Sequence, residues 1–163
     1  MQIYQQYNQE QLNLQYNIRL KVPGFETYLE KWDILSRLAE KKFPIIKDIP
    51  YGNLPRECLD VFPSGLPGSK TLLFIHGGYW QRFDKSMFHF IAGAFAKYGV
   101  TTVLINYPLA PAATMDRIVA SCQKAVQWLQ DNGTRLNADP DQLFIAGHSA
   151  GAHLATMILA TEK

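Results

Sequence analysis

The sequence has few cysteines, no excess of charge of one sign and no long apolar run. Its two cysteines, Cys58 and Cys122, lie in separate apolar segments without metal or redox spacing, which favours buried free thiols in a reducing compartment. The net charge is only +2 and the basic residues are scattered, so we expect neither a nucleic-acid partner nor a membrane partner. The longest mostly apolar stretch, residues 87–96, is too short to span a bilayer. The first residues do not resemble a signal peptide, and a cytoplasmic location is predicted by default.

The length and the hydrophobic content are sufficient for one domain with a hydrophobic core. The chain has 163 residues, of which 47% are hydrophobic, and this excludes a disordered protein. We predict an N-terminal arm and helix over residues 1–45 and the front portion of a single α/β domain over residues 46–163. Residues 1–17 are rich in Gln and Asn, and either a partly ordered arm or a helix fits them. An amphipathic pattern predicts a helix over residues 26–41, which Pro44 ends.

From residue 46 onward, short apolar runs alternate with longer helical patterns. Predicted strands cover residues 49–51, 58–62, 71–75, 101–106 and 143–146. Predicted helices run from the N-cap Asp84 to Gly99, over 115–132 with Gly133 as C-cap, and over 150–161. This alternation is typical of an α/β fold with a mostly parallel sheet and crossover helices. Functional groups in such sheets gather at the carboxyl ends of the strands.

The first informative motif follows the predicted strand 143–146. Residues 147–151 read G-H-S-A-G, a G-x-S-x-G sequence that leads directly into a predicted helix. A serine hydroxyl is a weak nucleophile, and a tight strand-to-helix turn projects it toward a base and a substrate. We therefore predict Ser149 as a catalytic nucleophile, with a serine in an ordinary turn as the alternative.

The second motif follows the predicted strand 71–75, where residues 76–80 read H-G-G-Y-W. Acyl transfer creates a negative oxygen, which backbone N–H groups fixed in advance stabilise. We expect an oxyanion hole formed by this loop and the residue after the nucleophile: Gly77, Gly78, Tyr79 and Ala150, with amide donors at the last three. His76 and Trp80 are expected to support the loop, His76 through a hydrogen bond from its ring to the backbone. A flexible glycine turn followed by a core tryptophan is the alternative.

These motifs resemble those of the α/β-hydrolase superfamily, and within it the kynurenine formamidase (arylformamidase) group. The H-G-G-x-W pattern at residues 76–80 and the extended elbow at 147–154 carry most of the likeness. Weaker similarities lie at residues 15–23 and 50–62, and residues 106–111 resemble esterases of the hormone-sensitive-lipase type. The resemblance implies a small-molecule substrate, an aryl formamide such as N-formylkynurenine in tryptophan catabolism, and hydrolysis without metal or organic cofactor.

The residues that would complete a catalytic triad are not evident in the sequence. In this fold the triad acid and the triad histidine come after the serine in the chain. After Ser149 the sequence contains one histidine, His153, and one acidic residue, Glu162. We expect His153 to be structural, and its spacing of five from His148 does not favour a metal site. We therefore expect the N-terminal portion of the fold, whose unpaired strand 143–146 could drive self-association into a homo-oligomer. A small-ester carboxylesterase and a non-catalytic remnant or binding module remain alternatives to the formamidase.

Overall fold

The computed structural model describes residues 2–160 and divides the chain into two compact units, one ending at Trp32 and the other beginning at Asp33. The first unit contains helix α1 (Gln9–Tyr16), a 3₁₀ turn (Ile18–Lys21) and the start of α2 (Phe25–Lys42). The Gln-rich start is thus helical around α1, where Asn8 and Gln11 each accept a hydrogen bond from the other's backbone N–H. No residue of α1 is buried, so capping and not packing defines this helix.

The second unit is built on a five-stranded sheet with the strand order β1-β2-β4-β3-β5. The strands are β1 (Ile46–Pro50), β2 (Cys58–Phe62), β3 (Ser69–Ile75), β4 (Thr101–Ile105) and β5 (Ala138–Gly147). Strands β4, β3 and β5 are parallel to one another, whereas β1 and β2 pair antiparallel at one side. The predicted α/β fold with a mostly parallel sheet is confirmed, and the end of β3 and the end of β5 lie side by side.

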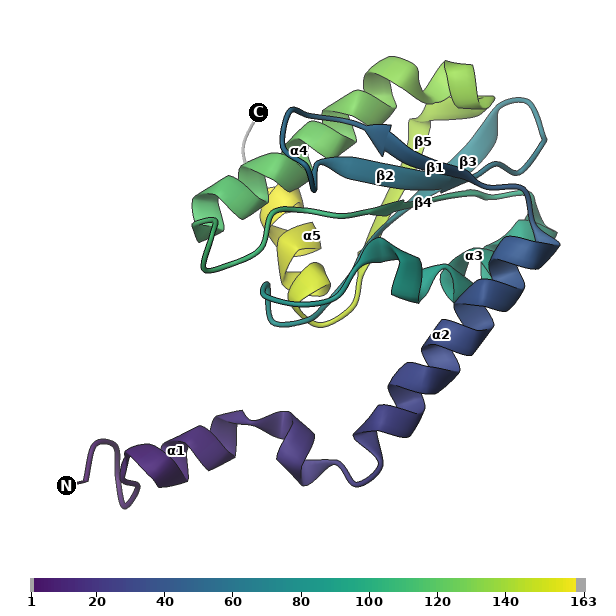
Figure 1. Cartoon of the computed structure of the whole chain (residues 1–163). Coiled ribbons are helices and arrows are strands. Elements are labelled where there is room, and N and C mark those ends of the chain that lie inside the picture. The colour runs from purple at the N-terminus through teal and green to yellow at the C-terminus, as the bar shows by residue number, and fades with distance from the viewer. Residues whose placement is uncertain (1, 161–163) are drawn as a thin grey trace. The chain divides into compact units, whose positions relative to one another are not determined.

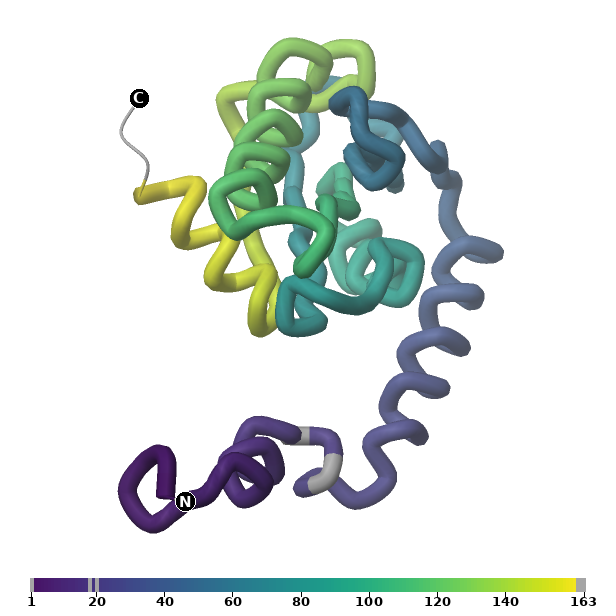
Figure 2. Tube along the Cα trace, turned by 60° about the vertical axis from the view of Figure 1, so that its left-hand side comes forward, coloured from purple at the N-terminus to yellow at the C-terminus, as the bar shows by residue number. Residues whose placement is uncertain are grey.

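Helices cover both faces of this sheet (Figures 1 and 2). Helices α4 (Met115–Asn132) and α5 (Ala150–Ala160) pack on one face, and α3 (Phe90–Phe95) lies on the other. The alternation along each strand explains both layers: Leu73 and Ile75 point into the core beneath α4 and α5, while Phe74 contacts Phe88 on the opposite side. The predicted helix 150–161 is confirmed up to Ala160, and its last residue lies outside the described residues.

One expectation about helix ends is wrong in detail. The segment from Asp84 to Gly99 is not one helix, because 3₁₀ turns at Lys85–Phe88 and Ala96–Tyr98 flank α3, and Phe95 is exposed. The predicted helix 115–132 with Gly133 as its C-cap is confirmed, although Gly133 is right-handed and continues into a 3₁₀ turn (Gly133–Leu136). The left-handed residue that ends this turn is Asn137, whose φ is 56°, a region that asparagine tolerates better than most side chains.

Strand β5 forms one edge of the described sheet, with β3 as its neighbour. Phe144 on this strand is 54% exposed, whereas every residue of β4 is buried. Between α4, β5 and α5 lies a groove of about 640 Å³ whose lining includes Val126, Leu143 and Ile145. Self-association through this edge stays a prediction. Within residues 2–160, no helix combines the length and apolar character that a membrane span requires.

Candidate active site

Ser149 stands at the turn between the end of β5 and the start of α5. Its φ is 54°, in the left-handed region that non-glycine residues seldom adopt, and its side chain is exposed. Backbone strain of this kind persists only where the surroundings impose it, and it gathers at functional sites. The sharp strand-to-helix turn expected from the G-x-S-x-G motif is therefore present.

The two elbow glycines are required by close packing. A Cβ atom on Gly151 would collide with the carbonyl oxygen of Ile75 and would lie 2.6 Å from that of His76. A Cβ atom on Gly147 would collide with the backbone of Gly151 in the following helix. Glycine at both positions lets α5 start directly against the end of β3, which sets the nucleophile beside the loop that follows β3.

Residues 76–83, which we call the oxyanion loop, pass close to the nucleophile. A Cβ atom on Gly77 would lie 2.7 Å from the carbonyl oxygen of His148 and 3.2 Å from the Cβ of Ser149. Beyond it the backbone turns through left-handed values of φ, 57° at Tyr79 and 58° at Trp80. The structure thus brings the two predicted motifs together.

Three backbone N–H groups at this junction are available to a ligand. In the part of the chain that the structure describes, the amides of Gly78, Tyr79 and Ala150 donate to no protein acceptor. Ala150 is the first residue of α5, where the helix leaves its N–H groups unpaired and its dipole favours negative charge. Unpaired amides of this kind are the donors that an oxygen gaining negative charge next to Ser149 requires.

His76 braces the start of the oxyanion loop. Burial lowers the pKa of His76 to about 4, so the ring is neutral near pH 7 and carries one proton. Its Nδ1 lies 2.7 Å from the carbonyl oxygen of Gly77, and because a carbonyl only accepts, Nδ1 is the protonated nitrogen. Tyr107 stacks on the ring at 4.4 Å between centroids and donates its hydroxyl proton to the carbonyl oxygen of His76 at 2.9 Å.

Trp80 contributes to both the loop and the core. Its ring packs against the main hydrophobic cluster, and its carbonyl oxygen accepts a hydrogen bond from Ala110 N–H at 2.9 Å. The edge of the ring meets His153 of α5 at 5.3 Å between centroids. The two alternatives for Trp80, a core aromatic or a loop-supporting residue, are therefore not exclusive.

No histidine in the described range forms a hydrogen bond to the Ser149 hydroxyl. His76 donates to Gly77, His89 lies between two carboxylates, and the ring of His153 packs against Trp80. The ring of His148 lies 6.0 Å from that of Phe88. A general base for Ser149 is thus not formed by residues 2–160.

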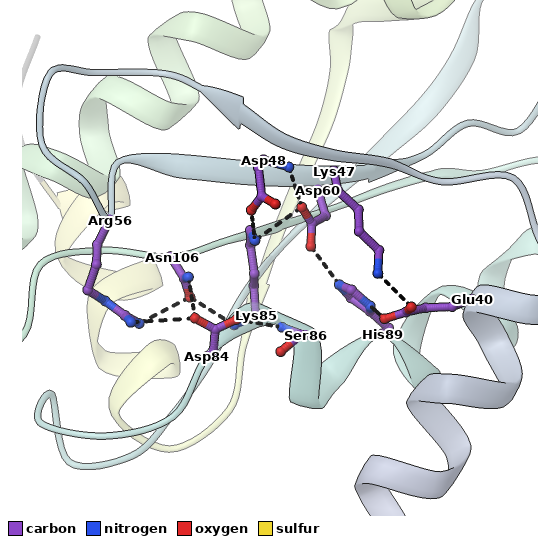
Figure 3. A network of polar contacts seen from close by, with 10 residues as sticks. All are labelled: Glu40, Lys47, Asp48, Arg56, Asp60, Asp84, Lys85, Ser86, His89 and Asn106. Carbon is purple, nitrogen blue, oxygen red and sulfur yellow. Dashed lines mark hydrogen bonds and ion pairs between the residues drawn. The ribbon is translucent and has the colours of Figure 1, made fainter.

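A buried polar network beside the loop was not predicted from the sequence (Figure 3). Lys85 Nζ lies 3.1 Å from Asp60 and 2.6 Å from Asp48, and His89 bridges Asp60 and Glu40. One signal could have revealed it: Asp60 interrupts the apolar strand C-L-D-V-F at residues 58–62. A carboxylate inside such a strand requires a charged partner, and Lys85 and His89, four residues apart, supply it.

The same network extends to the end of the oxyanion loop. Asn106, which follows β4, accepts a hydrogen bond from the Lys85 N–H at 2.8 Å and donates one to Asp84 at 2.5 Å. Arg56, from the loop between β1 and β2, contacts Phe83, Asp84 and Asn106. The end of the loop and the residues just after it are therefore held by side chains from two other segments.

Comparisons with known proteins agree with this geometry. The model of the BD-FAE family matches residues 61–163. The chain is 34% identical over 119 residues to the kynurenine formamidase of Danio rerio, which covers 72% of this chain and 39% of that protein. It is also 34% identical over 116 residues to Esterase LipQ of Mycobacterium tuberculosis, covering 68% of this chain and 28% of the esterase. The chain thus spans about two fifths of the length of the formamidase.

Among solved structures, a Silicibacter protein assigned as a thioesterase superimposes with a TM-score of 0.77 at 26% identity. The likeness covers 88% of this chain and 53% of the other.

Proposed function

Because this chain belongs to the BD-FAE family of α/β-hydrolases, we propose that its full-length protein is a serine hydrolase with Ser149 as the nucleophile. The observation that carries the proposal is the juxtaposition of Ser149 with Gly77 and with the unpaired amides of Gly78, Tyr79 and Ala150. The proposed substrate is a small aryl formamide such as N-formylkynurenine. The formamidase relative and the H-G-G-x-W loop support this choice.

In the proposed reaction, the Ser149 hydroxyl oxygen attacks the formyl carbonyl carbon while its proton passes to a base. The carbonyl oxygen becomes an oxyanion that accepts hydrogen bonds from the amides of Gly78, Tyr79 and Ala150. Collapse expels the aryl amine, which takes up a proton, and water then releases formate from the serine ester. These steps require no metal or organic cofactor.

The base is the part of this mechanism that residues 2–160 do not supply. Without a proton acceptor, binding and the oxyanion hole still give roughly 10³–10⁴-fold acceleration over water in comparable enzymes. We therefore expect the 163-residue chain alone to turn over an activated ester feebly, with little change in the Ser149→Ala variant. Ordinary turnover that vanishes in the variant would point to His153 or a partner chain as the base.

Two experiments on the full-length protein test the proposal. A serine-directed fluorophosphonate should label it once, at Ser149, and labelling that survives Ser149→Ala would place the nucleophile elsewhere. Its kcat/KM should be higher for N-formylkynurenine than for p-nitrophenyl acetate.

The opposite substrate preference would favour the second candidate, a carboxylesterase for small esters. The esterase relative from Mycobacterium tuberculosis supports that alternative, because one elbow and one oxyanion loop serve both reactions. A protein that binds the substrate but shows neither labelling nor turnover would be a binding module on a hydrolase scaffold.

A further inference from the structure

The oxyanion loop is a strained segment whose shape depends on what holds its two ends. Three non-glycine residues in it have left-handed φ values, 57° at Tyr79, 58° at Trp80 and 74° at Phe83. The turn is closed by hydrogen bonds from the amides of Gln81 and Arg82 to the carbonyl oxygen of Gly78, at 3.1 and 3.0 Å. Backbone in these regions relaxes unless the surrounding structure over-determines it.

The start of the loop is held by β3, by the His76 ring and by the Tyr107 hydroxyl. At the end, Asn106 bonds Asp84 and the Lys85 N–H just after the loop, and Arg56 also contacts Phe83 within it (Figure 3). Its Nη2 donates to the carbonyl oxygen of Phe83 at 2.9 Å and to Asn106 at 3.1 Å, and its Nε donates to the carbonyl oxygen of Tyr107 at 2.9 Å. Its Nη1 reaches Asp84 at 3.4 Å.

Through these contacts, both ends of the loop are attached to the same short segment, residues 106–107. Tyr107 fixes the start through its hydroxyl group, and the Arg56 guanidinium links the end to the Tyr107 carbonyl and the Asn106 side chain. A planar guanidinium donates in several fixed directions at once, whereas the ammonium of a lysine is a single point on a flexible stem. Charge alone would therefore not reproduce this clamp.

We propose that Arg56 is a positioning residue for the oxyanion hole, which holds the end of the loop so that the Gly78 and Tyr79 amides stay aimed at the carbonyl that Ser149 attacks. Arg56 acts through the loop and does not touch the substrate. The link to catalysis rests on the proposed function, but the link between Arg56 and the loop does not.

Hydrogen exchange in the 163-residue chain tests the structural link. In Arg56→Lys and Arg56→Gln, the amides of Gln81 and Arg82 should exchange roughly tenfold faster or more, because their hydrogen bonds to Gly78 open. Amides of β3 should be unaffected. The matched control is Arg37→Lys, which changes an exposed arginine paired with Asp33 on the same helix and should leave the loop unchanged. Unchanged exchange at Gln81 and Arg82 in Arg56→Lys overturns the proposal, and this variant decides if Arg56→Gln does not fold.

Fluorophosphonate labelling of the full-length protein tests the catalytic link. Arg56→Lys should lower the maximal labelling rate by about 10–100-fold while leaving the half-saturating reagent concentration unchanged, because the loss falls on stabilisation of the developing charge. A residue that only stabilises the fold would not produce this split at temperatures well below unfolding. Equal maximal rates in Arg56→Lys and wild type overturn the proposal. A wild-type protein that is not labelled at all contradicts the proposed function instead, and the exchange experiment still decides whether Arg56 holds the loop.

Discussion

The candidate active site and the buried network behind it differ in whether their polar groups are exposed and paired. At the site Ser149 is exposed and strained, and the three amides around it have no protein acceptor in the described range. In the network the side chains of Asp60 and Lys85 are 1% and 6% exposed, and both are paired. Buried charges that lack partners are costly, so the network contributes to stability only while it stays complete. The polar groups proposed for chemistry are thus left unpaired, whereas the buried charges of the network are paired.

His89 shows that a histidine next to carboxylates need not be a catalytic residue. A histidine between Asp60 and Glu40 resembles part of a catalytic triad, but its ring is fully buried and both nitrogens face carboxylate oxygens, at 2.8 and 2.7 Å. Both ring nitrogens are therefore engaged by carboxylates, and neither is hydrogen-bonded to Ser149. His89 therefore belongs to the structural region.

The titration of the network follows from its pairing. Burial by itself would raise the pKa of Asp60, but hydrogen bonds from His89 and the Asp48 amide, together with the charge of Lys85, hold that pKa below its usual value. Burial would likewise lower the pKa of Lys85, and the carboxylates of Asp48 and Asp60 outweigh it and raise that pKa. Both groups are thus held in their charged forms.

The largest effect expected is the loss of activity in Ser149→Ala of the full-length protein. Removal of the nucleophile should lower kcat for N-formylkynurenine by a factor on the order of 10⁶. The free energy of unfolding should change by less than about 0.5 kcal/mol, because Ser149 is exposed and its hydroxyl bonds no group within residues 2–160. Steady-state kinetics and urea unfolding measure the two quantities. A large loss of stability with activity retained would contradict this prediction and would make Ser149 a structural residue.

The converse change is Asp60→Ala in the network. We expect it to lower the free energy of unfolding by about 3–5 kcal/mol, because it leaves Lys85 and His89 buried beside a missing charge. Asp131→Ala is the control, since Asp131 is exposed and accepts a hydrogen bond from Gln127 one turn away. Urea unfolding of both variants should separate them clearly. Equal, small losses would mean that the network is no more important than a surface contact.

A third expectation concerns pH. The folded pKa of Asp60 lies below its unfolded value, so its contribution is present above about pH 4 and is lost as the pH falls toward the depressed folded value. The raised pKa of Lys85 gives a contribution that is present below about pH 10 and lost above it. The stability gap between wild type and Asp60→Asn should therefore be flat near neutrality and narrow below about pH 4. Thermal unfolding across this range measures the gap, and widening on acidification would contradict the assignment.

The smallest effect is expected at the rim of the network, in Lys47→Ala. Lys47 pairs with Glu40 at 2.6 Å, but the two side chains are 44% and 26% exposed. Such a pair contributes less than about 1 kcal/mol, and less still in about 1 M salt. Urea unfolding at low and high salt should show a small loss that shrinks with salt. A loss as large as that of Asp60→Ala would mean that this exposed pair contributes as much to stability as the buried pairs.

The sequence predicted those features that local pattern determines. The strands and α4 follow from periodicity, and the elbow and the oxyanion loop follow from contiguous motifs, whose glycines meet close backbone contacts. Arg56 and Asn106 were missed because they meet across fifty positions of sequence, a pairing that no local window contains. The breaks around α3 were missed because α and 3₁₀ turns share nearly the same apolar spacing, and tertiary contacts choose between them.

The strand order also governs how this sheet can assemble. Strands β2 and β3 are neighbours in sequence but are separated in the sheet by β4, whose residues enter between them from about forty positions later. Until β4 is in place, β2 and β3 each present an unpaired apolar edge to other chains. Slow, non-local pairing of this kind leaves a refolding chain exposed to aggregation. The yield of refolded protein should therefore fall steeply as its concentration rises, even where the native state itself is stable.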